Sequence, residues 1–335
     1  MRKLYFLLPG LGGRFACGGL WAELKTLRLV QQICSAEVVT YRQREPNTWF
    51  LPDLLQSRSP ASLQDVIFVV SWGFDVAKLI TQLQSYPVVY HAHSAGYRLR
   101  LPGRIPIITV SRNTLGYWGQ QAPHSLIYYL PNQISDEFVD RQQPRDLDVL
   151  VQARKSSSYL LQQLIPVLQK HCQVTVINGY VEDLVGLFNR AKIYLYDSAE
   201  YWAQQGVSEG FGLQPLEAIA SGCQVFSSLN GGLSDYLDPG FNCHKIAGYA
   251  IDYDVERILK VLKSPSPLVP DSLLAEYRAA HILQRLPVIL GEINDFFDRY
   301  AQYQQLIPPL TPRRIAQLRA QQFWHKLNRK LQRQR

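Results

Sequence analysis

The sequence predicts an α/β protein with two doubly wound domains in tandem. The chain has 335 residues, which is long for one domain and comfortable for two. Short apolar or β-branched runs alternate with helical stretches, as in βαβ units whose parallel sheet is covered on both faces. That alternation stops after Leu130 and restarts at Leu147. The apolar fraction of 47% is sufficient for two cores, and a charged fraction of 19% argues against disorder.

The first domain is predicted over residues 1–132. Its basic start is followed by a short apolar run that ends at Pro9, too short for a signal peptide, so we interpret it as the first strand. The strands are expected at Leu4–Leu8, Glu37–Thr40, Val66–Val70, Val88–His91 and Ile107–Val110. The helices are expected at Gly19–Val30 and Phe74–Gln84.

The second domain is predicted over residues 147–284, after a polar, proline-containing linker at residues 133–146. Its strands are expected at Leu147–Gln152, Val174–Ile177, Ile193–Tyr196 and Gln224–Ser227. Its helices are expected at Tyr159–Lys170, Glu182–Asn189 and Pro215–Ala220. Ligands of open α/β sheets bind at the carboxyl ends of the strands, so two such domains predict a binding cleft between them.

The end of the chain is predicted to be helical. Residues 285–310 are expected to return across the first domain, and residues 311–335 form a basic helical tail. The tail has eight Lys and Arg residues and no acidic residue. It is interpreted as a solvated helix or as a contact with an anionic membrane, for which Phe323, Trp324 and Leu327 supply an apolar side. No recognised nucleic-acid module accompanies it, so no nucleic-acid partner is expected.

The composition also argues against two classes of protein. No run of eighteen apolar residues occurs, so no transmembrane span is expected. The five cysteines are scattered and form no C-x-x-C, which indicates neither a zinc site nor a disulfide framework. A reducing, cytoplasmic location is therefore expected.

The most informative segment is a glycine-rich loop that runs into a helix, Glu209-Gly-Phe-Gly-Leu-Gln-Pro-Leu-Glu217. Gly210 and Gly212 allow the backbone to approach a ligand closely. The free N–H groups at the start of the following helix suit a diphosphate. Glu209 is then expected near the sugar of a donor, and Glu217, in the first helical turn, near a ribose.

The string E-G-F-G-L-x-x-L-E-A, with its E-x7-E spacing, resembles the signature of GT-B retaining glycosyltransferases of family four, the "glycosyl transferases group one". The pair Gly231-Gly232 followed by Asp235 is similar to a family loop in which the acid is usually Glu. Leu130-Pro-Asn-Gln133 is similar to the start of the family's linker, with Gln in place of glycine. The resemblance implies the GT-B fold, two Rossmann-like domains facing a cleft, with a helical C-terminal extension.

The resemblance also implies the site. The first domain is then on the acceptor side, and the second binds the nucleotide sugar. The implied catalytic residues are Glu209, His93, Arg154 and Lys155. The implied donor-binding residues are Gly210, Phe211, Gly212, Leu213 and Glu217, together with the pair Gly18 and Gly19 before the first helix. In this pattern Arg154 and Lys155 neutralise the diphosphate as its charge develops.

Two histidines close the strand that begins at Val88. His91 and His93 point to the same side, because side chains alternate along a strand. The family has a histidine near the donor sugar, which His93 matches best and His91 second. A neutral imidazole there could donate a hydrogen bond to a sugar hydroxyl.

Structural interpretations stay open beside these. The histidines could be buried core residues, Arg154 and Lys155 a surface pair, and the loop at Gly10–Gly19 a tight turn. That loop lacks the G-x-G-x-x-G spacing of a dinucleotide site. Ser111 could be a helix cap or a cleft contact.

The implied function is transfer of a sugar, of the hexosyltransferase type, from a nucleoside-diphosphate donor to an acceptor hydroxyl with retention of anomeric configuration, in glycan biosynthesis. The acceptor is expected to be a carbohydrate or lipid-linked. No cofactor is expected. The resemblance also implies that no metal is needed, because cationic side chains and a helix terminus replace it. The alternatives are a sugar-nucleotide epimerase of the same fold and a non-catalytic nucleotide- or sugar-binding protein. If the tail binds lipid, the location would be the inner face of a membrane.

Overall fold

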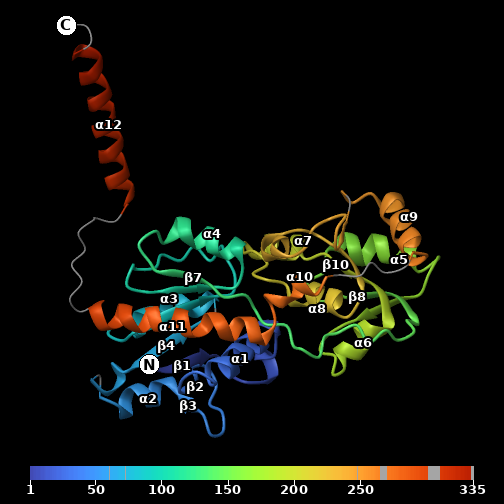
Figure 1. Ribbon diagram of the computed structural model, residues 1–335, viewed down its shortest axis with the longest axis horizontal. Coiled ribbons are helices and arrows are strands. Elements are labelled where there is room, and N and C mark those ends of the chain that lie inside the picture. Colours follow the sequence, from blue (N-terminus) through green and yellow to red (C-terminus); the bar gives the residue numbers. More distant parts are fainter. Residues whose placement is uncertain (60, 72, 247, 265–269, 301–309, 333–335) are drawn as a thin grey trace. The chain divides into compact units, whose positions relative to one another are not determined.

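The computed structural model describes residues 1–332 except 60, 72, 247, 265–269 and 301–309 (Figure 1). The chain divides into two compact units, Met1–Asn294 and Asp295–Arg335. The first unit contains two parallel sheets, each covered by helices on both faces. The prediction of two doubly wound α/β domains is therefore confirmed.

The first sheet has seven parallel strands in the order β3-β2-β1-β4-β5-β6-β7. The strands are β1 (Lys3–Leu8), β2 (Ala36–Thr40), β3 (Trp49–Phe50), β4 (Val66–Val70), β5 (Val88–Ala92), β6 (Ile107–Thr109) and β7 (Ile127–Tyr129). The helices are α1 (Gly18–Val30), α2 (Leu51–Ser57), α3 (Val76–Gln82) and α4 (Arg112–Gln121). The central strand β4 is buried along its whole length, as its unbroken apolar sequence requires in a sheet covered on both faces.

The second sheet has five parallel strands in the order β12-β11-β10-β8-β9. They are β8 (Leu147–Gln152), β9 (Val174–Ile177), β10 (Ala191–Tyr196), β11 (Gln224–Ser227) and β12 (His244–Lys245). The helices are α5 (Ile165–Leu168), α6 (Leu184–Arg190), α7 (Ala199–Gln205), α8 (Leu213–Ala220), α9 (Ile251–Leu262) and α10 (Asp271–Ala275). The strand order reverses beside β8, so the loops after β8 and β10 meet at the switch point, where ligands bind.

Two helices of the second domain differ from their predictions, one in its type and one in its first residue. The helix expected at Tyr159–Lys170 is a π-helical turn, Tyr159–Leu164, that continues as α5, because Pro166 has no N–H for a regular α-helical bond at that point. The helix expected from Pro215 begins at Leu213, after Gly212 at a φ of 77°. Glu217 therefore lies in the second turn of α8, and its placement in the first turn was wrong.

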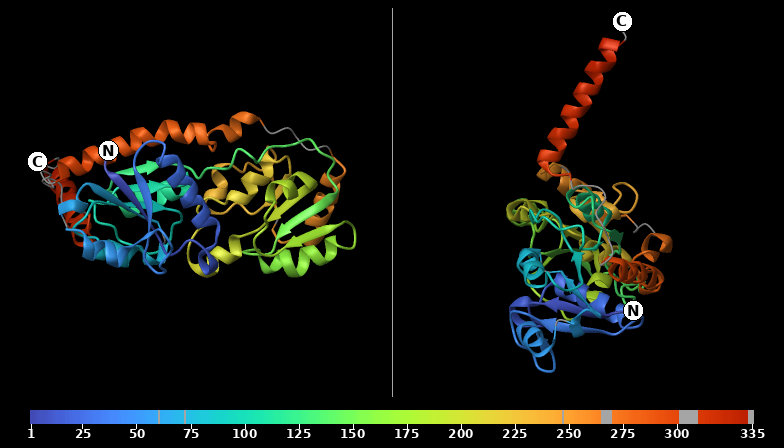
Figure 2. Two further views of the ribbon diagram at one scale, coloured as in Figure 1. Left: turned by 90° about the horizontal axis from the view of Figure 1, so that it is seen from below. Right: turned by 90° about the vertical axis from the view of Figure 1, so that its left-hand side faces the viewer.

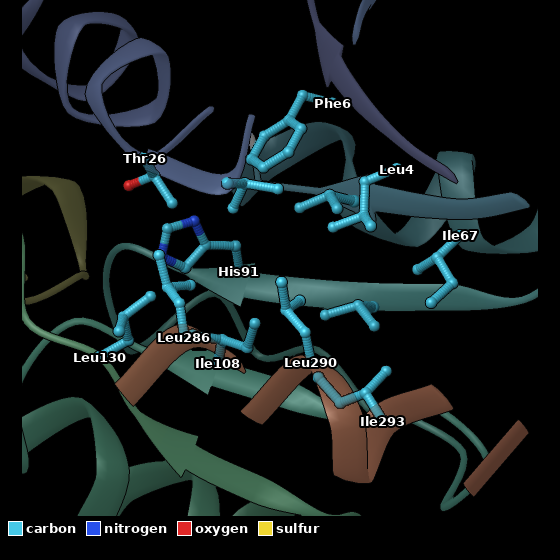
Figure 3. Close-up of a pocket in the computed structure, with 13 residues that line it drawn as sticks. Leu4, Phe6, Thr26, Ile67, His91, Ile108, Leu130, Leu286, Leu290 and Ile293 are labelled. Carbon is cyan, nitrogen blue, oxygen red and sulfur yellow. The ribbon is translucent and has the colours of Figure 1, made fainter. Parts of the chain in front are cut away.

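α11 (Ala279–Tyr300) runs along the first domain (Figures 1 and 2). Its inner face packs on β1, β4 and β6, and the backbone N–H of Arg2 donates to Asn294 Oδ1 at 2.8 Å. Figure 3 shows the apolar void beneath this helix, bordered by Leu286, Leu290 and Ile293. Its volume of about 20 Å³ is close to that of one water probe, so it is a packing void in the core.

The linker and the start of α11 are connected. Between β7 and β8 the chain has no helix or strand, and the backbone N–H of Ile134 donates to the carbonyl of Tyr277 at 3.0 Å. The guanidinium of Arg278 donates to the carbonyls of Ser135 and Phe138 at 2.7 and 2.8 Å. The chain thus crosses between the domains twice, side by side (Figure 2, left).

α12 (Pro312–Gln332) belongs to the second unit. Its side chains are mostly exposed, including Phe323 and Trp324 at 63% and 60%. The side chain of Leu327 lies outside the described residues. No helix in the described part of the chain is long and apolar enough to span a membrane.

Candidate active site between the two sheets

A cleft of about 570 Å³ lies within the first unit, and both sheets contribute to it. From the first domain it is lined by the start of α1 and by the segment that follows β5. From the second domain it is lined by the loops after β8 and β9 and by residues 209–214 and 217. Every residue that the sequence placed in the donor site lines this cleft.

The carboxylate of Glu209 is held by three side chains on one of its oxygens. Oε2 accepts hydrogen bonds from Tyr196 Oη at 2.6 Å, Trp202 Nε1 at 2.7 Å and Ser198 Oγ at 3.1 Å. Glu209 is 5% exposed, and what remains exposed borders the cleft. Hydrogen bonds to a charged acceptor are strong, so the three donors fix this carboxylate in one orientation.

The loop that carries Glu209 is docked on the first domain through the backbone of Ala95, which bonds to the N–H and the hydroxyl of Ser208. Ala95 and Ser208 exchange two hydrogen bonds, at 3.0 and 3.2 Å. A Cβ atom on Gly210 would lie 1.4 Å from the carbonyl oxygen of His93. Only glycine fits this contact. Gly232 is similarly confined, with its Cβ position 2.1 Å from the carbonyl oxygen of Gly210.

α8 points its N-terminus into the cleft, and no side chain caps that end. Its first N–H groups are therefore available to an anion. Gly212 and Leu213 form the turn into the helix and line the cleft. Phe211 also lines the cleft, but the residue is only 2% exposed and its ring packs on Tyr236 and Tyr277. Little of that ring is therefore accessible from the cleft.

Glu217, one turn further along α8, faces the first domain. Its Oε1 lies 3.8 Å from the ammonium of Lys25 on α1. Burial raises the pKa of Glu217, and the Lys25 charge offsets part of that effect. The pair joins the two sides of the cleft at the position where a ribose was expected.

Arg154 and Lys155 follow β8 at the switch point. The guanidinium of Arg154 lines the cleft and makes no side-chain hydrogen bond or ion pair with a described residue. Lys155 has a φ of 68°, and its ammonium lies 4.4 Å from the ring centroid of Trp202, close enough for a cation–π contact.

The serines after Lys155 are tied to the loop after β10. Ser157 Oγ donates to Asp197 Oδ2 at 2.6 Å, and Glu200 accepts from the N–H and hydroxyl of Ser158 at 2.7 and 2.8 Å. The segment around Asp197 and Glu200 leads into the helix α7. These two acids hold the loop after Lys155.

Gly18 and Gly19 form the first residues of α1, whose N-terminus also lines the cleft without a side-chain cap. A Cβ on Gly18 would meet nothing within 4 Å. The absence of a side chain at Gly18 therefore leaves open space beside the uncapped N–H groups of α1. The cleft thus receives two helix N-termini, one from each domain.

His91 and His93 both contact Glu23 of α1. Glu23 Oε2 lies 2.6 Å from His91 Nδ1 and 2.7 Å from His93 Nε2. His93 borders the cleft with 17% of its side chain exposed, whereas His91 is buried beside the void under α11 (Figure 3). The prediction that both rings share one side of the strand agrees with this arrangement.

Glu23, His91 and His93 are also the described residues whose ligand atoms cluster closely enough to hold a metal ion. Tetrahedral zinc with bonds of about 2.0–2.1 Å places its ligand atoms about 3.3 Å apart. The observed separations of 2.6 and 2.7 Å are those of hydrogen bonds instead. The arrangement is a hydrogen-bonded triad.

Three further residues have roles at the domain boundary. Ser111 is fully buried and forms a capping box with Thr114 at the start of α4, so it is a helix cap and lies outside the cleft. Asp235 accepts from the backbone N–H of Arg112 at 2.6 Å and so links the second domain to α4. Asn132 lines the cleft.

The sequence did not indicate Glu23, Lys25 or Trp202 as site residues. Glu23 and Lys25 lie on a helix whose pattern predicts only an amphipathic element. Trp202 lies on α7, and its contact with Glu209 depends on that helix. A signal was available for Glu23, since a glutamate on an inward-facing helix position needs polar partners.

Residues 154–276 match the model of the family described as glycosyl transferases group 1. No curated protein matches the chain. Solved structures do match it. A sucrose-phosphate synthase from Thermosynechococcus elongatus is 12% identical, with a TM-score of 0.60, over 88% of this chain and 100% of that one.

Two other solved structures are similar to the same extent. Anabaena Alr3699/HepE in complex with UDP-glucose is 14% identical with a TM-score of 0.63, over 87% of this chain and 100% of that one. A glycosyltransferase from Rickettsia africae is 11% identical with a TM-score of 0.57, over 88% and 98%. At these identities the likeness shows the fold. Residues 154–276 are therefore similar to the glycosyl transferases group 1 family, and the chain has the two-domain GT-B fold that its E-x7-E string led us to expect.

Proposed function

We propose that this protein transfers a sugar from a nucleoside-diphosphate donor to an acceptor hydroxyl with retention of anomeric configuration. One observation carries the proposal. The pair Glu209 and Glu217, Arg154, and His93 come from three separate segments of the chain, and all four border one cleft between two doubly wound sheets. Other families on this fold bind ligands in the same crevice, so the argument depends on these side chains.

The donor's diphosphate is proposed to bind at the uncapped N-terminus of α8, beside Arg154 and Lys155. The guanidinium of Arg154 is available for it, and the ammonium of Lys155 leaves Trp202 to reach it. Fixed cations and N–H dipoles stabilise charge that develops on a leaving group. In this proposal they replace a metal ion, and no cofactor is needed.

The two glutamates are proposed to hold opposite ends of the donor. Glu209, fixed by its three donors, accepts from a hydroxyl of the sugar. Glu217 accepts from the ribose, and Lys25 then remains beside it as a partner from the first domain. Because Alr3699/HepE was solved with UDP-glucose, a UDP-sugar is the first donor to test.

Retention is supported by the distribution of carboxylates. Among the described residues, those that line the cleft with a carboxylate are Glu209 and Glu217, both from the second domain. Glu23 of the first domain is 1% exposed, and its carboxylate is hydrogen-bonded to His91 and His93. We therefore propose front-face transfer assisted by the leaving phosphate, without a nucleophile from the first domain.

The donor site is tested by thermal shift with UDP, GDP and ADP, with and without magnesium. A ligand at a hundred times its Kd adds about 2.7 kcal/mol, which raises Tm by a few degrees. We expect one nucleotide to do so without metal, and Glu217→Ala to remove most of the shift. Glu182→Ala, at an exposed position, is the matched control and should keep it.

The reaction is then followed by NMR of the anomeric proton of the product. An α-donor should give an α-linked product only when an acceptor is present. Conversion of the donor sugar without acceptor would establish the epimerase alternative. Failure of every nucleotide to shift Tm would remove the donor site from this proposal.

The basic tail is proposed to contact an anionic membrane surface. α12 has six Lys and Arg residues, no acidic residue, and exposed Phe323 and Trp324. Each basic residue near such a surface contributes about 1 kcal/mol. The acceptor would then be lipid-linked or held close to the membrane.

For the tail, we expect the double variant Arg319→Ala/Lys326→Ala to bind phosphatidylserine-containing vesicles roughly 30-fold more weakly than the parent chain. Co-sedimentation measures this, with pure phosphatidylcholine vesicles as the uncharged control. Arg98→Ala/Arg100→Ala removes the same charge outside the tail and should have little effect. Equal binding of the parent chain to both vesicle types would contradict the proposal.

A further inference from the structure

The triad of Glu23, His91 and His93 determines where the histidine protons lie. One carboxylate oxygen, Glu23 Oε2, is the common partner of His91 Nδ1 and His93 Nε2. A carboxylate only accepts hydrogen bonds when ionised. Both ring nitrogens that face it must therefore carry a hydrogen.

The charge states agree with this assignment. Burial alone would raise the pKa of Glu23, but the contacts with His91 and His93 outweigh it and hold that pKa well below its usual range. Burial, assisted by the neighbouring His91, lowers the pKa of His93 despite the attraction of Glu23. At neutral pH the carboxylate is thus ionised and His93 is neutral, with one N–H.

The single N–H of His93 is used by Glu23, so the other ring nitrogen has none. His93 Nδ1 makes no hydrogen bond with any described residue, and the ring borders the cleft. His91 differs because its ring borders the apolar void under α11 (Figure 3) and is not among the residues that line the cleft.

We propose that Glu23 is a positioning residue that fixes the tautomer of His93, so that a bare Nδ1 is presented to the cleft as the acceptor for a hydroxyl of the donor sugar. The proposal rests on the proposed function. It reverses the direction of the hydrogen bond expected from the sequence, in which the imidazole donated.

The surroundings keep Glu23 in place. The carboxylate is 1% exposed, and its other oxygen, Oε1, is buried without a hydrogen-bond partner among the described residues. Burying this oxygen without a partner is costly, so fold stability does not account for a carboxylate at this position. Lys25, two residues further along α1, is paired with Glu217, and the two histidines are the partners of Glu23.

Histidine-selective 15N labelling of the full chain tests the tautomers without any substrate. The chain has 7 histidines, and His91→Gln and His93→Gln assign the two signals. We expect His93 to show the Nε2–H form and His91 to carry a hydrogen on Nδ1. In Glu23→Gln the side chain keeps its size but offers an N–H₂ donor, so His93 should become a mixture of both forms.

The same variant is then assayed with the donor. We expect Glu23→Gln to lower kcat roughly tenfold, as for the loss of one neutral hydrogen bond, with the Kd of the nucleoside diphosphate unchanged. Glu23→Asp, which keeps the charge, should recover part of the activity. Glu37→Gln makes the same chemical change on the half-exposed partner of Lys3 and should leave kcat unchanged.

Donors that lack one sugar hydroxyl complete the test. One deoxy donor should lose activity with the parent chain and lose no further activity with Glu23→Gln, because the two changes remove the same contact. An Nδ1–H form of His93 in the parent chain would overturn the proposal, as would unchanged tautomers and kcat in Glu23→Gln. If no nucleotide binds at all, the proposed function fails, and the tautomers still decide the role of Glu23.

Discussion

Gly210→Ala is expected to lower kcat/KM for sugar transfer by about 10²-fold or more. The reason is steric, because the added Cβ would lie 1.4 Å from the carbonyl oxygen of His93. A backbone oxygen cannot rotate away as a side chain can, so the loop and the first domain must separate. A displacement of 1 Å at a reacting centre is enough for a loss of this size.

The separation also breaks the two hydrogen bonds between Ala95 and Ser208 and carries Glu209 away from His93. Each domain retains its own core, so we expect normal circular dichroism. Donor binding should weaken less than kcat, because the diphosphate and ribose contacts belong to the second domain.

Activity assays, nucleotide Kd and small-angle scattering of the Gly210→Ala variant measure these effects. The matched control is Gly116→Ala in α4, where a Cβ meets nothing within 4 Å. It should keep full activity and gain about 0.5–1 kcal/mol of stability, since alanine is the better helix residue. A Gly210→Ala enzyme within twofold of the parent would show that this contact is not needed for transfer.

Much of the fold could be predicted from the sequence because its determinants are local. β4 is an unbroken apolar run between turn residues, and its bounds agree with the prediction. The elements that were missed carry weaker local signals. β3 has two residues, and α4 has two glycines, Gly116 and Gly119, with its start defined by the Ser111 capping box.

The candidate site could be predicted in part, for a similar reason. The segment from Glu209 to Glu217 is contiguous, so its glycines and carboxylates are visible as a pattern. Glu23 and Lys25 act through residues about 70 and 190 positions away, and their partners follow from how α1 faces β5 and α8. The start of α8 at Leu213 depends on the left-handed backbone of Gly212. The sequence indicated Pro215 as the first helical residue instead, because proline is common at that position.

Glu209→Gln is expected to lower kcat about 10²-fold with little change in the Kd of the nucleoside diphosphate. A hydrogen bond to a charged group contributes about 1.5–3 kcal/mol, which corresponds to a 10- to 150-fold effect when it acts on the reacting sugar. Glutamine cannot replace the carboxylate in either orientation. If its amide oxygen accepts from Tyr196, Ser198 and Trp202, its N–H₂ faces the sugar in place of an acceptor.

In the other orientation the N–H₂ group meets the three side chains. The hydroxyls of Tyr196 and Ser198 can turn to accept from it, but the indole N–H of Trp202 only donates and is left unpaired, which destabilises the fold by roughly 1–3 kcal/mol. Tm therefore separates the two cases, while kcat falls in both. Tyr196→Phe removes only the donor at 2.6 Å and should have a smaller effect, because Trp202 and Ser198 still hold the carboxylate.

Steady-state kinetics measures kcat of Glu209→Gln, and calorimetry measures its nucleotide Kd. Glu182→Gln, at an exposed position, is the control. Loss of nucleotide binding in Glu209→Gln would move this residue to the nucleotide end of the cleft. Unchanged kcat would mean that the three donors stabilise the loop and that the sugar is oriented elsewhere. The expected result, a fall in kcat alone, places the reacting sugar between Glu209 and His93, where the two domains meet.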